Sequence, residues 1–100
     1  MGLFRKIFGI GPKVDCHELL KNGAVLIDVR TPSEYSAGHV KGSTNIPLDK
    51  IKTKVDKIKQ LKKPVVLCCR SGMRSGQATS ILKSAGVQEV YNGGAWNNFA

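Results

Sequence analysis

Two short runs of apolar residues set the strongest constraint on the fold of this 100-residue chain. The run AVLIDV occupies residues 24–29 and the run PVVLCC occupies residues 64–69, and in neither do polar residues alternate with apolar ones. Such a run is typical of a strand whose two faces are both covered, because its side chains meet apolar neighbours on either side. The two runs therefore predict a parallel sheet between layers of helices.

Helix signals surround these runs. Asp15 with Glu18, and Thr31 with Glu34, have the spacing of capping boxes and predict a helix after each. Apolar residues at helical spacing predict two more helices, through Ile51, Val55, Ile58 and Leu61 and through Ala78, Ile81, Leu82 and Ala85. We expect short strands at residues 43–47 and 89–92, with Gly93-Gly94 as a turn after the last one. The alternation predicts an α/β fold with three layers, α/β/α, around a central parallel sheet of about four to five short strands.

The chain is long enough for one domain, which we expect at residues 13–100. Residues 1–12 stand apart as a tail or short amphipathic segment that ends in a Gly- and Pro-containing break. We expect this segment to pack on the domain; a weak membrane or partner contact through residues 3–8 is the alternative. No apolar run is long enough to span a bilayer and no secretory signal is present, so the sequence predicts a cytoplasmic protein without a transmembrane segment.

The formal net charge of +9 favours anionic partners, which are small anions, nucleic acid or acidic membrane lipid. The lysine-rich stretch from Lys50 to Lys63 is interpreted as a solvated face, because it lacks the interleaved aromatic residues of a single-strand nucleic-acid surface. We therefore expect no nucleic-acid partner. The three cysteines are an odd number, and two of them are adjacent, which disfavours a disulfide framework and favours a reducing compartment. The absence of a CxxC pair and of a His cluster predicts no metal site, and no cofactor is expected.

The stretch CCRSGMRS, residues 68–75, follows the second apolar run at the expected carboxyl edge of the sheet, where ligands bind in such folds. A tight loop that opens a helix turns its backbone N–H groups inward and forms an anion-binding nest. Gly72 supplies the backbone freedom for this turn. A cysteine at the mouth of the nest would have a lowered pKa and be nucleophilic, and Arg74 would neutralise an anion.

Two loops of different length can be counted to Arg74. Four residues lie between Cys69 and Arg74, and five lie between Cys68 and Arg74. The shorter loop suits a sulfur atom and the longer one a phosphate. The residues alone therefore leave two chemistries open.

The segments LIDVRTPSEYSAGHVKGSTNIP and VVLCCRSGMRSGQATSILKSAGVQEVYNGGAW together resemble the single-domain rhodaneses, which are thiosulfate or persulfide sulfurtransferases. The resemblance runs from about Val14 to Trp96. It implies that Cys69 is the catalytic nucleophile, which receives sulfur from a small anionic donor such as thiosulfate and passes it to cyanide, a thiol or a protein acceptor. The loop residues would bind the substrate: Arg70, Ser71, Gly72, Met73, Arg74 and Ser75.

The other matched motif contributes Asp28, Arg30, Glu34 and His39, which we interpret as a polar network that supports the site. Trp96 is expected in core or rim packing, and Cys68 as a small buried strand residue. Two alternatives remain beside the sulfurtransferase. One is a Cys-x5-Arg phosphatase or arsenate reductase that uses Cys68, and the other is a binding module without catalysis on the same scaffold.

Overall fold

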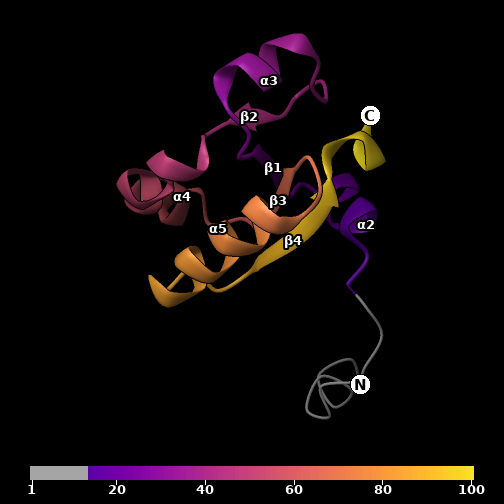
Figure 1. Ribbon diagram of the computed structural model, residues 1–100. Coiled ribbons are helices and arrows are strands. Elements are labelled where there is room, and N and C mark those ends of the chain that lie inside the picture. The colour runs from indigo at the N-terminus through magenta and orange to yellow at the C-terminus, as the bar shows by residue number, and fades with distance from the viewer. Residues whose placement is uncertain (1–13) are drawn as a thin grey trace.

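The structure is a computed structural model that describes residues 14–100 (Figure 1). The tail expected at residues 1–12, with its proposed contact through residues 3–8, lies outside the described residues. Within the described range the strands are β1 (Val25–Asp28), β2 (Thr44–Asn45), β3 (Val65–Cys69) and β4 (Val90–Ala95). The α-helices are α2 (Cys16–Lys21), α3 (Pro32–Ala37), α4 (Val55–Leu61) and α5 (Met73–Ser84), and two 3-10 helices are η1 (Leu48–Lys54) and η2 (Trp96–Phe99).

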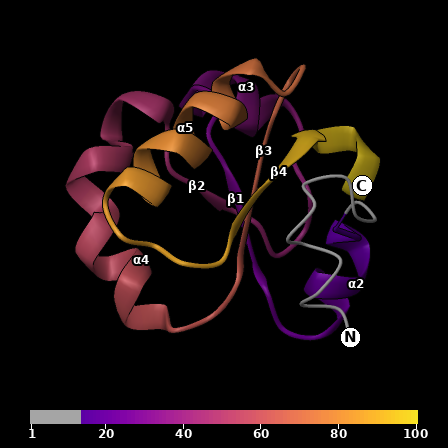
Figure 2. The ribbon, with the colours of Figure 1, turned by 90° about the horizontal axis from the view of Figure 1, so that it is seen from below.

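The strands form one parallel sheet in the order β2-β1-β3-β4. Side chains of β3 alternate between its two faces: Leu67 and Cys69 pack with residues of η1, α4 and α5, whereas Val66 and Cys68 pack with residues of α2 and η2. Figure 2 shows the strands between α4 and α5 on one side and α2 on the other. The expected three-layer α/β/α fold is confirmed, with four strands in the described part of the chain.

The capping box at the start of α3 is present as predicted. The backbone N–H of Glu34 donates to Thr31 Oγ1 over 3.2 Å, and the backbone N–H of Thr31 donates to Glu34 Oε1 over 3.0 Å. Pro32 occupies the first helical position, where its missing N–H costs no helical hydrogen bond. Local sequence therefore sets both the start of α3 and the direction in which the side chain of Glu34 points.

The turn expected at Gly93-Gly94 is wrong, because β4 continues through both glycines to Ala95. The strand contains a bulge there: Leu67 pairs with Asn92 but Cys68 pairs with Gly94. A Cβ atom at Gly93 would lie 2.8 Å from Val66 Cγ1 and 2.9 Å from Phe99 Cζ. Gly93 is thus required by close packing against β3 and η2, and not by a turn.

The single helix expected from Ile51 to Leu61 is also corrected. Residues 48–54 form the 3-10 helix η1, and α4 begins only at Val55. Ile51 and Ile58 are buried as their spacing predicts, but Leu61 at the end of α4 is 44% exposed. The tighter 3-10 turn changes the angular spacing of side chains, so a 3.6-residue period does not hold over both segments.

The order of the strands locates the position where a site is expected. The chain moves from β1 outward to β2 and then crosses back to β3 on the other side of β1, so the order reverses between β1 and β3. In open parallel sheets, ligands bind at the carboxyl ends of the strands at such a reversal. No helix in residues 14–100 has both the length and the apolar character needed to cross a bilayer.

Candidate active site

The carboxyl ends of β1 and β3 meet at this reversal point. Asp28 pairs with Cys68 in the sheet, and the backbone N–H of Val29 donates to the carbonyl of Cys68 over 2.9 Å. Cys69 is the last residue of β3, and α5 begins four positions later at Met73. The structure therefore brings the two motifs expected from the sequence to one edge of the sheet.

The loop after β3 wraps the sulfur of Cys69 in hydrogen-bond donors. The backbone N–H of Gly72 donates to Cys69 Sγ over 2.9 Å, and that of Ser75 donates over 3.4 Å. Ser75 Oγ also lies 3.4 Å from Cys69 Sγ. Gly72 has a φ of 101°, a left-handed value that favours glycine and directs its amide toward the sulfur. The anion nest predicted from the sequence surrounds Cys69.

These donors shift the acidity of the Cys69 thiol. Burial alone would raise its pKa, since the side chain has no exposed area and a thiolate is poorly solvated there. Hydrogen bonds from the Ser75 hydroxyl and from the Ser75, Gly72 and Ser71 amides outweigh burial, so the pKa of Cys69 is lowered. A lowered pKa increases the fraction of nucleophilic thiolate near neutral pH.

Cys68 lies in a different environment although it is the neighbouring residue. Successive strand residues face opposite sides, so Cys68 packs in the apolar cluster with Leu26 and Val66, under α2 and η2. Burial, reinforced by the negative charge of Asp28, raises the pKa of Cys68 to about 12. The Cys68 side chain therefore lies outside the amide nest, as a small buried residue, which is the role expected for it.

Arg74 is held by an acidic partner from another element. Its Nη1 and Nη2 atoms donate to the two carboxylate oxygens of Glu34 over 2.6 and 3.0 Å. The hydrogen bond from Arg74 is the largest reason why the pKa of Glu34 is lowered to about 2, with the backbone hydrogen bond from Thr31 next. Arg74 thus joins the first turn of α5 to the first turn of α3.

Asp28 and Arg30 form a buried ion pair at the end of β1. Arg30 Nε and Nη2 donate to the Asp28 carboxylate over 2.8 to 3.0 Å, and Asp28 is completely buried. Arg30 Nη2 also donates to the carbonyl of Gly38 over 2.7 Å, and the Arg30 guanidinium lies 4.4 Å from the centre of the Trp96 ring. The pair ties the end of β1 to the end of α3, and Trp96 packs at the rim.

His39 does not contact the nest through any hydrogen bond found in the described residues. Its Nδ1 atom lies 2.8 Å from the carbonyl oxygen of Tyr35, and its ring stacks on the Tyr35 ring at a centroid distance of 3.8 Å. His39 therefore interacts with α3 itself.

The outer side of the nest is formed by exposed residues. Arg70 and Ser71 are exposed, and Met73 is 76% exposed at the first position of α5. Among the ion pairs of residues 14–100, none involves Arg70, so its charge faces solvent at the mouth of the loop. The nest thus has a buried sulfur at its centre and a cationic rim.

Sequence reasoning missed one residue of the site. Asn92 in β4 accepts a hydrogen bond from Ser75 Oγ over 2.6 Å and donates to the carbonyl of Gly72 over 3.0 Å. The sequence placed Asn92 at the end of a strand before a turn, with nothing to indicate a contact with residues 72–75. The one signal in the sequence is the Gly93-Gly94 pair after Asn92, since a glycine inside a strand often marks a bulge and bulges are enriched next to active sites.

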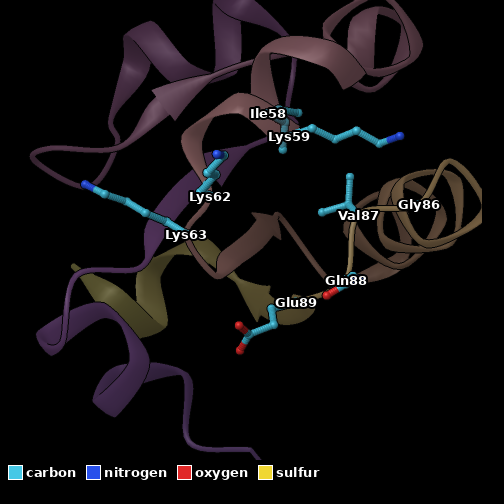
Figure 3. Close-up of a pocket in the computed structure, with 8 residues that line it drawn as sticks. All are labelled: Ile58, Lys59, Lys62, Lys63, Gly86, Val87, Gln88 and Glu89. Atoms are coloured by element: carbon cyan, nitrogen blue, oxygen red, sulfur yellow. The ribbon is translucent and has the colours of Figure 1, made fainter.

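The described residues also line a cavity of about 470 Å³ at the opposite edge of the sheet (Figure 3). Its lining comes from the end of α4 and from the connection between α5 and β4, and includes Lys59, Lys62 and Glu89. In Figure 3 the side chain of Lys63 points away from the other lysines. The cavity lies at the amino ends of β3 and β4, whereas Cys69 ends β3, so it is separate from the nest.

The protein is a three-layer parallel α/β domain with a cysteine in an amide nest at the reversal point of its sheet. Such an arrangement can support a cysteine nucleophile. The family model described as Rhodanese-like domain matches residues 13–99. The chain therefore belongs to the rhodanese-like family.

Individual relatives agree with the family. The chain is 45% identical over 69 residues to the Bacillus subtilis protein YqhL, covering 69% of this chain and 54% of that protein. It is 37% identical over 75 residues to the Escherichia coli protein named thiosulfate sulfurtransferase PspE, covering 74% and 72% of the two chains. Among solved structures, an E. coli rhodanese with anions is 37% identical with a TM-score of 0.71, covering 78% of this chain and 93% of that one. The human single-domain sulfurtransferase TSTD1 is 31% identical with a TM-score of 0.65, covering 82% and 86%.

Proposed function

We propose that the protein is a sulfurtransferase that carries a sulfane sulfur as a persulfide on Cys69. The observation that supports this most directly is the ring of N–H donors around the Cys69 sulfur, which favours an anionic sulfur. Relatives named thiosulfate sulfurtransferase support the same chemistry. Since this chain spans only about half of YqhL, activity, substrates and partners are proposals for this chain.

In the first half of the cycle, the Cys69 thiolate attacks the outer sulfur of a donor such as thiosulfate. A new bond forms between Sγ and this sulfur, and the bond to the sulfonate group breaks, with its electron pair leaving on sulfite. The displacement is formally similar to thiol–disulfide exchange. The outer sulfur now carries the negative charge, and the loop amides and the N-terminus of α5 stabilise it.

In the second half, an acceptor attacks the outer sulfur of the persulfide. The acceptor gains the sulfur atom, and the electron pair of the S–S bond returns to Cys69 Sγ as thiolate. Cyanide would leave as thiocyanate, and a thiol or a protein acceptor would leave as a persulfide. The cycle uses no cofactor, and its proposed location is the cytoplasm.

We assign different roles to the two loop arginines. Arg70 is exposed at the mouth and would meet the anionic donor, with the amides of Ser71 and Gly72 completing the binding site. Arg74 is engaged by Glu34 and would act by its charge and by holding the first turn of α5 in place. Met73 and Ser75 would line the outer and inner sides of the loop.

The experiment that tests the function is the intact mass of the protein after incubation with thiosulfate. We expect a gain of one sulfur atom, its loss on addition of cyanide, and no gain in Cys69→Ala. A mass that does not change, or a gain of the same size in Cys69→Ala, would contradict the proposal.

The phosphatase or arsenate reductase alternative has less support. It requires Cys68 as nucleophile, but this side chain lies in an apolar cluster and its pKa is raised to about 12. The non-catalytic binding module has no need of a cysteine at the centre of an amide nest. The sulfurtransferase is therefore the function that the site supports best.

A further inference from the structure

Asn92 connects three parts of the site that are distant in sequence. Its Oδ1 atom accepts hydrogen bonds from Ser75 Oγ over 2.6 Å and from the backbone N–H of Gly94 over 3.0 Å. Its Nδ2 atom donates to the carbonyl of Gly72 over 3.0 Å. The Asn92 side chain thus links the first turn of α5, the bulge of β4 and the loop residue whose amide binds Cys69 Sγ.

The orientation of the Asn92 amide is determined by two of these partners. The backbone N–H of Gly94 can only donate, so the atom that faces it is the amide oxygen, and the carbonyl of Gly72 can only accept, so the atom that faces it is the amide nitrogen. Ser75 Oγ contacts the oxygen and must therefore donate its proton. A hydroxyl has one proton, so Ser75 cannot donate to Cys69 Sγ at the same time.

The charge on Cys69 decides which acceptor is better. A neutral thiol can donate its own proton to Ser75 Oγ while Ser75 donates to Asn92, which gives a chain of hydrogen bonds in one direction. A thiolate has no proton, and the hydroxyl stabilises it only by turning away from Asn92. A hydrogen bond to a charged acceptor is stronger than one between neutral groups, so the hydroxyl turns when the sulfur is charged.

We propose that Asn92 is a positioning residue for Cys69 that acts through the Ser75 hydroxyl. Asn92 Oδ1 accepts the hydrogen bond from the Ser75 hydroxyl while Sγ is neutral, as a thiol or as the inner sulfur of a persulfide. The Ser75 hydroxyl keeps its proton and turns to donate a hydrogen bond to Sγ whenever Sγ is a thiolate, before attack on the donor and again when the acceptor removes the outer sulfur. This inference rests on the proposed function, because it concerns how the Ser75 hydroxyl stabilises the proposed nucleophile, Cys69.

The titratable and charged groups near Cys69 lie apart from the contact between Asn92 and Ser75. Arg74 comes from α5, Asp28 and Arg30 lie at the end of β1, and Cys68 and Arg70 are the adjacent residues. None of these groups hydrogen-bonds to Asn92 or Ser75 in the described residues. Variants at positions 75 and 92 therefore leave these charges in place.

The test is the titration of the Cys69 thiol, followed by thiolate absorbance in the ultraviolet as the difference between each protein and its Cys69→Ser counterpart. Removal of the competing acceptor in Asn92→Ala should lower the midpoint by about half a pH unit to one unit, roughly three- to tenfold more thiolate below it. Asn92→Asp retains an acceptor and adds negative charge, so its midpoint should rise. Both variants lose the hydrogen bond to the Gly72 carbonyl, so this loss cannot explain a difference in sign.

The effect of Asn92 must depend on Ser75. In a Ser75→Ala background, Asn92→Ala should no longer lower the midpoint, because the hydroxyl that Asn92 controls is absent. Equal shifts with and without the Ser75 hydroxyl, a shift of zero in both included, would overturn the proposal and leave Asn92 as a support of the loop. Asn92 is exposed, so water can replace its hydrogen bonds in a folded variant, which circular dichroism would verify. The titration needs no sulfur donor, so its outcome is separate from whether thiosulfate is a substrate.

Discussion

Arg74 and Glu34 form an ion pair with two hydrogen bonds, of 2.6 and 3.0 Å, although 40 residues separate them in the chain. Both residues lie in the first turn of their helices, and Glu34 also completes the capping box of α3 with the N-cap residue Thr31. One carboxylate thus fixes the start of α3 and the loop that surrounds Cys69. The stability of the domain and the shape of the nest are coupled through this contact.

Glu34 should make the stability of the protein depend on pH in the acid range. Its pKa is lowered to about 2 in the folded protein, below that of an unfolded glutamate of about 4.3. The contribution is fully present above the unfolded pKa and is lost as the pH falls toward about 2. We expect the melting temperature of wild type to fall more steeply between about pH 5 and pH 2 than that of Glu34→Gln. Glu18→Gln, at an exposed position of α2, is the control; parallel curves for wild type and Glu34→Gln would refute the expectation.

The lowered pKa of Cys69 predicts the pH profile of persulfide formation. The thiolate is the reactive form, so the rate with limiting thiosulfate should rise with pH to a plateau. The midpoint of this rise should lie below about 8.5, the pKa of an unperturbed cysteine. Ser75→Ala removes a hydroxyl that lowers the pKa, so its midpoint should move upward. Single-turnover mass spectrometry at several pH values measures both. If the midpoint of wild type lay at or above the pKa of a free cysteine, it would contradict the claim that the loop hydrogen bonds lower the pKa of Cys69.

The adjacent cysteines should differ sharply in function. Cys69→Ala and Cys69→Ser should abolish sulfur transfer, because a hydroxyl is a far weaker nucleophile and stays protonated. Cys68→Ala should retain most of the activity and lose about 1 kcal/mol of folding stability through a small cavity. Assays with thiosulfate and cyanide, together with urea unfolding, test the pair. We would abandon the assignment if Cys68→Ala were inactive, Cys69→Ala active, and an aryl phosphate a better substrate than thiosulfate.

Arg70 should assist the capture of anionic donors. Its charge lies at the rim of the loop and is screened by salt, so Arg70→Gln should raise the KM for thiosulfate several-fold and weaken its dependence on ionic strength. Lys57→Gln, an equal loss of charge at an exposed position of α4, should leave the KM close to wild type. Equal KM values for all three proteins at low salt would exclude a specific role for Arg70.

Residues 1–11 should be dispensable for sulfur transfer. The family match begins at residue 13, and the helices and strands that build the nest all follow it. Truncation of these residues, followed by the thiosulfate assay and circular dichroism, tests this. A folded truncated protein with greatly reduced turnover would show that the segment contributes to the site.

Local signals in the sequence were sufficient for the framework of the protein. The apolar runs predicted β1 and β3, and the spacing of Thr31 and Glu34 predicted the start of α3. The loop after Cys69 was predicted as an anion nest from its glycine and its place between a strand and a helix. These features depend on neighbours within a few residues, because hydrogen bonds and side-chain periodicity inside one element are short-range.

Only the tertiary structure decided where the groups of the site lie relative to one another. The two cysteines are adjacent in sequence, but the pleat of β3 sends Cys69 into the nest and Cys68 to the opposite face. The bulge at Gly93, which the sequence suggested was a turn, brings Asn92 to the Ser75 hydroxyl. Each of these outcomes depends on packing between strands and helices that are distant in the chain, and such packing has no local signature in the sequence.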